Sequence, residues 1–325
     1  MSSRELWFTA PGCVELRSTA AAALRQGQIR LRALASGISQ GTELLLYRGE
    51  GPTPFDASLD APGAPTYPRR YGYAWVGEIV ESQSAQHPLG ARAFALLAHG
   101  DEHCVEASRV RLLPSIIPAE RATLAANLET AINVVWDAGI ALGDEVVVIG
   151  GGVVGLLVGH LAKQSGAAQV RLMEPSTTRR TAGLALGFDA AQSPTEGVPA
   201  ASADVVIEAS GDPACLATAI QLARDEGAIV VASFYGQRQA PVPLGADFHR
   251  RRLSLKASQV SRLPPTKTAG WSFDRRFALV TKLLENPALD ALLGPPAPFD
   301  DAPATYARLA RAPGDALQTV FHYAR

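Results

Sequence analysis

Residues 145–163, "EVVVIGGGVVGLLVGHLAK", constrain this chain more than any other stretch. Seventeen residues without a formal charge lie between Glu145 and Lys163. A helix that spans a bilayer needs about 20 mostly apolar residues. This run is shorter, and five of its residues are glycines, which weaken a helix interior. The stretch therefore does not predict a membrane span.

Divided at its glycines, the stretch predicts a strand, a turn and a helix. Residues 145–149 are short and rich in β-branched side chains, which is typical of a strand buried on both faces. Residues 153–165 have helical periodicity and are followed by Gly166. The turn between them, "GGGVVG", fits the pattern GxGxxG. We call residues 150–155 the glycine turn.

Each position of the glycine turn has a physical task in binding a dinucleotide. Gly150 permits the tight turn, Gly152 lets a pyrophosphate approach the backbone, and Gly155 allows the helix to pack close to the strand. Val153 and Val154 open the helix, whose N-terminal N–H groups and positive dipole end attract phosphate. The alternative is a glycine-rich turn that binds no ligand.

An acidic residue after the next strand strengthens the dinucleotide interpretation. Residues 169–173 predict that strand, and Glu174 follows it, 19 residues beyond Gly155. A carboxylate there is placed to bond the ribose hydroxyls of the adenosine. A 2′-phosphate about 5 Å from it would cost roughly 3 kcal/mol at an effective dielectric near 20. Arg179 and Arg180 could offset this cost. We therefore expect NAD, with NADP still possible.

The order of apolar segments predicts an all-β part followed by an α/β part. Short apolar runs separated by glycine and proline precede residue 124. After it, strand and helix patterns alternate, which is typical of a doubly wound parallel sheet. The strands expected before residue 124 are 28–39, 75–80, 92–98 and 103–107. Those expected later are 203–210, 228–234, 252–258 and 316–324, with helices at 213–227 and 273–287.

Composition excludes several classes of protein. The 325 residues suffice for two domains, and a net charge of −1 gives no general affinity for nucleic acid or anionic membranes. Cys13, Cys104 and Cys215 are scattered, so we expect a reducing compartment and no cysteine-based structural zinc. The first residues lack a secretory signal. A cytoplasmic protein is predicted.

Four motifs resemble the medium-chain dehydrogenases/reductases, the alcohol dehydrogenase superfamily. They are "ASGISQGTE" at 35–43, "YGYAWVGEIV" at 71–80, the segment 128–157, and "DVVIEASG" at 204–211. The resemblance implies a GroES-like β domain and a Rossmann domain with a doubly wound parallel sheet. It also implies a homodimer. We expect the GroES-like domain at 1–123 and 259–325, and the Rossmann domain at 124–258.

The chain departs from the zinc-dependent members of that superfamily at each ligand position. Ser39 or Gln40 stands at the cysteine position, where an inserted residue makes the alignment ambiguous, and Tyr73 stands at the histidine position. The third ligand position falls near Ala126 and Asn127. We therefore expect neither the catalytic nor the structural zinc. The "SGISQGTE" form also resembles the bacteriochlorophyllide a dehydrogenase branch, which looks zinc-free.

His99 and His103 have the HxxxH spacing of some metal ligands. Their flanks read as strands, so the two side chains are not expected to converge as they would on a helix. Two unrelated loop histidines are the simpler interpretation, and no metal site is predicted.

Without zinc, hydrogen-bonding side chains must handle the substrate oxygen and its proton. The resemblance places Tyr73, Ser39 and Glu129 at positions suited to this work, and Thr130 and Ser258 beside the nicotinamide. Each has a structural alternative. Tyr73 can be a packed aromatic, Ser39 a turn residue and Glu129 a salt-bridge partner.

We expect a zinc-independent oxidoreductase that moves a hydride between NAD(P)(H) and a small or medium organic molecule. The substrate is an alcohol, a carbonyl compound or an activated alkene, and the direction is left open. The alternative is a nucleotide-binding protein without catalysis that acts as a sensor or a partner-binding subunit.

Overall fold

The computed structural model describes residues 3–20, 22–52, 54–55, 66–311 and 315–324. The chain divides into two compact units. The first contains Met1–Ala126 and Thr281–Arg325, and the second contains Asn127–Val280. Each unit is built around its own sheets and apolar core.

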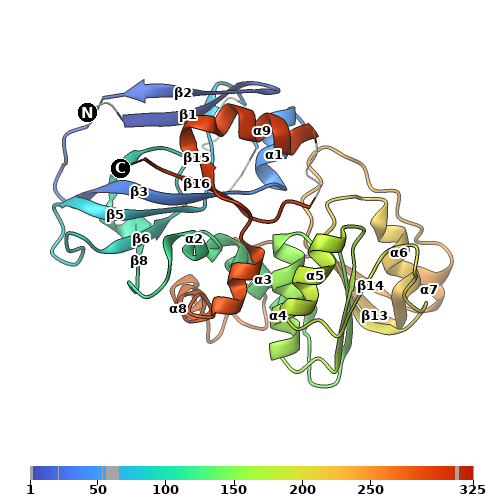
Figure 1. Cartoon of the computed structure of the whole chain (residues 1–325). Coiled ribbons are helices and arrows are strands. Elements are labelled where there is room, and N and C mark those ends of the chain that lie inside the picture. Colours follow the sequence, from blue (N-terminus) through green and yellow to red (C-terminus); the bar gives the residue numbers. More distant parts are fainter. Residues whose placement is uncertain (1–2, 21, 53, 56–65, 312–314, 325) are drawn as a thin grey trace. The chain divides into compact units, whose positions relative to one another are not determined.

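The second unit is built on one parallel sheet (Figure 1). Its order is β11-β10-β9-β12-β13-β14, and every neighbouring pair is parallel. The chain reverses its direction of travel across the sheet between β9 and β12, which is the switch point of a doubly wound sheet. The predicted Rossmann arrangement is confirmed. The strands are β9 (Glu145–Ile149), β10 (Gln169–Met173), β11 (Ala190–Gln192), β12 (Ala203–Glu208), β13 (Ala223–Val231) and β14 (Ser254–Ala257).

Helices lie against both faces of this sheet. Successive side chains of a strand point to opposite faces. On β10, Leu172 lies on the face covered by α5, because a Cβ at Gly183 would be 2.8 Å from it. Met173 joins the apolar cluster that includes Leu216 and Ile220 of α6. The helices are α3 (Ala125–Ala138), α4 (Val153–Gln164), α5 (Thr177–Ala185), α6 (Cys215–Leu222), α7 (Asp247–Arg250) and α8 (Phe273–Leu283).

The stretch at 145–163 folds as its glycines predict, into β9, a turn and α4. Four of the five β9 residues are buried, and α4 buries the side of Leu156, Leu157 and Leu161. Among the described residues, no helix is both long enough and apolar enough to cross a membrane.

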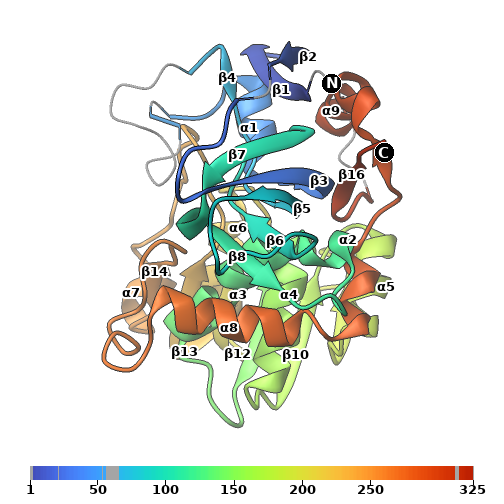
Figure 2. The same cartoon turned by 90° about the vertical axis from the view of Figure 1, so that its left-hand side faces the viewer.

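The first unit is mainly antiparallel. β1 (Ser3–Ala10) lies between β2 (Cys13–Thr19) and β4 (Arg69–Arg70) in one sheet. A larger sheet has the order β15-β16-β3-β5-β6-β8, and β7 also pairs with β3 (Figure 2). Its strands are β3 (Gln28–Ile38), β5 (Trp75–Ser82), β6 (Arg92–Ala95), β7 (Glu102–Glu106), β8 (Val110–Leu113), β15 (Ala297–Pro298) and β16 (Thr319–His322).

The C-terminal segment completes the first unit. β16 pairs with β3, and Phe321 and Tyr306 are fully buried in the cluster that contains Leu6 and Phe8 of β1. Figure 1 shows α9 (red) beside β1 and β2. Short helices of this unit are α1 (Thr42–Arg48), α2 (Ala119–Ala122) and α9 (Ala302–Arg311). Turns of 3-10 helix lie at Ala107–Arg109, Pro287–Leu292 and Phe299–Asp301. The predicted GroES-like plus Rossmann fold class is confirmed, because an antiparallel β unit accompanies a unit with a doubly wound parallel sheet.

Two boundaries differ from the sequence expectation. Residues 259–280 lie in the second unit, since Arg276 bonds Glu129 and Trp271 packs on Trp136. The helix expected at 213–227 ends at Leu222, because Ala223 is extended and pairs with Ala203 of β12. Periodicity could not reveal either difference, since both depend on a partner distant in sequence.

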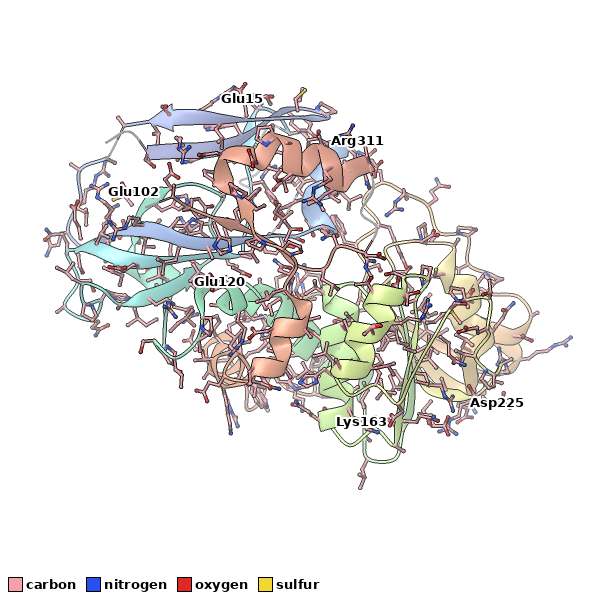
Figure 3. All side chains as sticks on the ribbon, in the orientation of Figure 1. Glu15, Glu102, Glu120, Lys163, Asp225 and Arg311 are labelled. Carbon is pink, nitrogen blue, oxygen red and sulfur yellow. The ribbon has the colours of Figure 1, made fainter. Side chains whose placement is uncertain are left out.

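Charged side chains lie at the periphery of each unit. Figure 3 shows Glu15 and Arg311 on the outside of the first unit, and Lys163 and Asp225 on the outside of the second. The Lys163 ammonium bonds Asp189 at 2.8 Å. Such partly exposed pairs contribute little to stability.

Candidate functional site

The glycine turn joins β9 to α4, and Gly150, Gly152 and Gly155 each have a different environment. Gly150 has φ +100°, and a Cβ there would be 2.5 Å from the backbone of Ser210. A Cβ at Gly155 would be 2.0 Å from the carbonyl oxygen of Gly150, so α4 can approach the turn only without a side chain there. A Cβ at Gly152 would meet nothing within 4 Å. The first two glycines are needed for packing, and the third leaves open space.

The open space lies at the N-terminus of α4. Gly152 is the N-cap residue, with extended φ and ψ, and Val153 and Val154 form the first turn. The first N–H groups of a helix have no partner within the helix. Together with the positive end of the helix dipole they form a site suited to phosphate. These residues fit the diphosphate of a dinucleotide.

Glu174 lies directly beside the glycine turn. Its carboxylate is 3% exposed and accepts hydrogen bonds from the N–H groups of Gly151 at 2.6 Å and Ser176 at 2.8 Å. Arg179 lies 3.9 Å from the same carboxylate. The carboxylate therefore also fastens the glycine turn to β10. A 2′-phosphate near it would meet one negative and one positive side chain.

A second buried carboxylate, at the carboxyl end of an inner strand, was missed by sequence reasoning. Glu208, at the end of β12, is fully buried and accepts hydrogen bonds from the Ser210 N–H at 2.8 Å and from the hydroxyls of Ser210 and Tyr235. Burial, and then the carboxylate, raise the pKa of Tyr235. Because Ser210 packs on Gly150, this cluster holds the loop beside the glycine turn. The only signal was an acid ending the strand in "DVVIEASG".

In the first unit, Ser39, Tyr73 and Thr42 bring three hydroxyls together, and we call them the hydroxyl cluster. The Tyr73 hydroxyl donates to Ser39 Oγ and lies 3.3 Å from Thr42 Oγ1. The side-chain amide of Gln40 instead donates to the carbonyl of Leu317. Of the two residues at the ambiguous position, Ser39 meets Tyr73 and Gln40 does not.

Glu43 sets the backbone of this cluster. It is fully buried, its carboxylate accepts from the Ser39 N–H at 2.8 Å, and its own N–H donates to the Ser39 carbonyl at 2.8 Å. The reciprocal pair fixes residues 39–43 as a turn that leads into α1. The sequence alone carries no sign of this contact.

Glu129 is engaged in a salt bridge within the second unit. Its carboxylate lies 3.0 and 3.2 Å from the guanidinium of Arg276, which is 3% exposed and also bonds Asn133 at 3.0 Å. This favours the structural alternative for Glu129. Thr130 is the next residue of α3 and is half-buried.

Ser258 follows β14, and its hydroxyl donates to Asp137 of α3 at 2.8 Å. Its backbone N–H bonds Val231 of β13 at 2.9 Å. The hydroxyl therefore joins α3 to the segment that follows the edge strand β14. A nucleotide beside this segment would meet its backbone groups rather than the Ser258 hydroxyl.

A catalytic zinc does not fit the side chains of the hydroxyl cluster. Protein zinc sites use thiolate, imidazole and carboxylate ligands, whereas Ser39 and Tyr73 offer hydroxyls. His99 bonds Glu43 and His103 bonds the Ala98 carbonyl, so the two imidazoles serve different neighbours. Burial lowers the pKa of His103 to about 4. Within the described residues, no three histidine, cysteine or acidic side chains gather as a metal site would require.

Residues 153–272 match the family described as zinc-binding dehydrogenase. The chain is 25% identical to D-guloside 3-dehydrogenase of Escherichia coli K12 over 333 residues, covering 93% of this chain and 95% of that protein. It is 30% identical to scyllo-inosose 3-dehydrogenase of Thermotoga maritima over 168 residues. That match covers 46% of this chain and 42% of the relative, so the matched segment is less than half of the relative's length.

A solved structure shows the same fold at low identity. A candidate zinc-binding dehydrogenase from Sinorhizobium meliloti 1021, bound to NADP, superimposes with a TM-score of 0.81 and 20% identity. The match covers 99% of each chain. The expected resemblance to the zinc-binding and medium-chain dehydrogenases is supported. The zinc-free branch, and the likeness to bacteriochlorophyllide a dehydrogenase, remain predictions.

Proposed function

We propose that this protein is a zinc-independent, nicotinamide-dependent oxidoreductase. Its fold matches that of a solved candidate zinc-binding dehydrogenase, and its residues 153–272 match the zinc-binding dehydrogenase family. The observation that carries this proposal is the glycine turn. Its open position at Gly152 lies at the N-terminus of α4, beside the buried Glu174. A bound nicotinamide nucleotide would accept or supply the hydride, and the protein's own residues would bind the substrate and manage one proton.

The hydroxyl cluster is proposed to manage that proton. When an alcohol becomes a ketone, its hydroxyl loses a proton while the carbon loses a hydride. Tyr73 Oη donates to Ser39 Oγ, so the alcohol can pass its proton to Tyr73 while Tyr73 passes its own to Ser39 and Ser39 releases one to solvent water. In the reverse direction the Tyr73 hydroxyl donates to the carbonyl oxygen, where negative charge develops. No step requires a metal.

We propose polyhydroxylated secondary alcohols and their ketones as substrates. Two relatives of this chain are named scyllo-inosose 3-dehydrogenase and D-guloside 3-dehydrogenase. Both names indicate a secondary alcohol among other hydroxyls. Carbonyl reduction is the same reaction in reverse, and reduction of an activated alkene remains the alternative chemistry for a site built from hydroxyls.

NAD is proposed as the preferred nucleotide, with NADP possible. The Glu174 carboxylate disfavours an added phosphate, while Arg179, 3.9 Å away, reduces that penalty. The solved neighbour from Sinorhizobium meliloti holds NADP, so the discrimination in this fold depends on local side chains.

A cytoplasmic homodimer is also proposed. β14 is the edge strand of the parallel sheet, and each of its residues is exposed. An exposed edge strand is a template for pairing with another strand. Light scattering on the purified chain tests the dimer, and a mass of one chain would contradict it.

The deciding experiment combines nucleotide binding with turnover. Calorimetry with NADH and NADPH tests the glycine turn, and a panel of polyols, ketones, enones and quinones tests the chemistry. We expect binding of at least one nucleotide and turnover of a polyol or its ketone. Binding without turnover on any panel would favour the alternative of a catalytically inactive sensor or partner-binding subunit. No binding at all would reject both.

Tyr73→Phe tests the role of the hydroxyl cluster. Loss of the donor should lower kcat by about 10²- to 10³-fold, while nucleotide affinity stays unchanged. Tyr47→Phe is the control, since Tyr47 is buried in the same unit, stacked on Tyr306. Metal analysis completes the test, because one tightly bound zinc per chain would contradict the zinc-independent mechanism.

A further inference from the structure

We propose that His99 is a positioning residue that holds the two chain segments carrying Ser39 and Tyr73. This rests on the proposed function of the hydroxyl cluster, because it assigns His99 no contact with substrate. Its role is to fix the distance between two hydroxyls that come from different parts of the sequence.

One side of the imidazole supports the Ser39 segment. His99 is 1% exposed, and its Nε2 lies 3.0 Å from Glu43 Oε2. The other oxygen of the Glu43 carboxylate accepts the Ser39 N–H at 2.8 Å. Because a carboxylate oxygen accepts, Nε2 is assigned as the donor of this bond. Glu43 therefore accepts from His99 on one oxygen and from the Ser39 N–H on the other, which links His99 to the Ser39 backbone.

The ring of the same imidazole supports the Tyr73 segment. Gly72 has φ +135°, and a Cβ there would lie 3.0 Å from Cδ2 and 3.2 Å from Nε2 of His99. The backbone of His99 also donates to the Tyr71 carbonyl, at 3.4 Å. The residue before Tyr73 therefore rests on the imidazole, in a conformation that favours glycine.

The rest of the buried polar array keeps the imidazole in one orientation. Ser36 Oγ lies 2.6 Å from His99 Nδ1 and 2.6 Å from the Tyr323 hydroxyl, and the Tyr306 hydroxyl donates to Glu43. Burial raises the pKa of both tyrosines, so both remain donors. Ser36 and Glu43 are fully buried, which denies water access to this array. A serine, histidine and glutamate in this order resemble a hydrolytic triad, but their burial excludes a substrate.

His103 provides a matched control. It lies in the same segment, its Nε2 bonds the Ala98 carbonyl at 2.8 Å, and its ring contacts Trp75 edge-on at 5.0 Å between centroids. It is the same residue type in the same unit, and its bonds lead neither to Glu43 nor to Gly72. Replacing it should cost stability without moving the hydroxyl cluster.

The test uses the full chain with 3-fluorotyrosine at Tyr73 and a fluorine NMR readout that requires no turnover. His99→Phe keeps a flat ring under Gly72 but removes the hydrogen bonds, whereas His99→Gln keeps a donor and an acceptor. We expect one sharp signal in the wild type and in His103→Phe, and a shifted or broadened signal in His99→Phe. His99→Gln should lie between them.

Activity gives the second readout. His99→Phe should lower kcat by roughly 10- to 100-fold with nucleotide affinity unchanged, because small misplacements of reacting groups are costly. His99→Gln should recover part of that loss.

The proposal is overturned if His99→Phe alters neither the fluorine signal nor kcat, or if His103→Phe alters them equally. Should His99→Phe fail to fold, His99→Gln and Tyr306→Phe give the same comparison in milder form. If the wild type shows no turnover but the fluorine signals of the wild type and the variants follow the expected pattern, the proposed function is rejected and the positioning role is supported.

Discussion

The glycine turn of the second unit and the hydroxyl cluster of the first unit are held by different kinds of interaction. The glycine turn depends on the absence of side chains, since Gly150 and Gly155 pack backbone against backbone. The hydroxyl cluster depends on the presence of side chains, since Glu43 and His99 connect residues far apart in the sequence. Steric demands are rigid, whereas hydrogen bonds can be partly replaced. Substitutions in the two regions should therefore fail in different ways.

Gly155→Ala should have the largest effect. Its Cβ would lie 2.0 Å from the Gly150 carbonyl, so α4 must move or the turn must open. Because the clash is with backbone, we expect a loss of more than about 3 kcal/mol in the free energy of unfolding, above the usual range for overpacked cores, together with loss of nucleotide binding. Urea unfolding and calorimetry measure both.

Gly152→Ala is the control for that substitution, because its Cβ would meet no atom of the protein. The free energy of unfolding should stay nearly unchanged while nucleotide affinity falls. Equal destabilisation by the two substitutions would contradict the division of tasks within the glycine turn.

Glu129→Gln separates a structural role from a catalytic one. It leaves the guanidinium of Arg276, 3% exposed, without its charged partner. We expect unfolding to become easier by about 3 kcal/mol, as when one partner of a buried pair is removed. Turnover by the folded protein should change little. A large loss of turnover at unchanged stability would instead restore Glu129 as a catalytic candidate.

Acidification should weaken the first unit through His103. Burial lowers the pKa of His103 to about 4 from 6.5, so the unfolded chain binds this proton more readily than the folded one. Its contribution is present above about pH 6.5 and is lost as the pH falls towards 4. Between pH 7 and pH 5 the expected loss is about 2 kcal/mol. Urea unfolding at both pH values should show this loss, and His103→Phe should reduce it.

Glu174→Gln should have the smallest effect. Removing the charge leaves most of the hydrogen bonding to Gly151 in place and removes the repulsion of a 2′-phosphate. We expect the affinity for NADPH relative to NADH to rise by about tenfold, equivalent to about 1.4 kcal/mol. An unchanged ratio would show that Glu174 only fastens the glycine turn.

The sequence predicted well where neighbouring residues decide the structure. The β9, turn and α4 succession appears where "EVVVIGGGVVG" placed it, because the conformational freedom of Gly150 and the start of a helix are local properties. Segment ends were predicted less well. The helix expected to run to residue 227 stops at Leu222, since pairing with β12 outweighs helical periodicity.

By itself, the sequence determined the parallel sheet with its glycine turn and the presence of Ser39 and Tyr73 in place of metal ligands. Only the tertiary structure decided what these residues contact. It chose Ser39 over Gln40 as the partner of Tyr73, paired Glu129 with Arg276 147 positions away, and set Tyr306 263 positions away against Glu43. The physical reason is that a buried polar group must find a hydrogen-bond partner wherever the fold brings one. A single sequence carries no periodic signal for such a meeting.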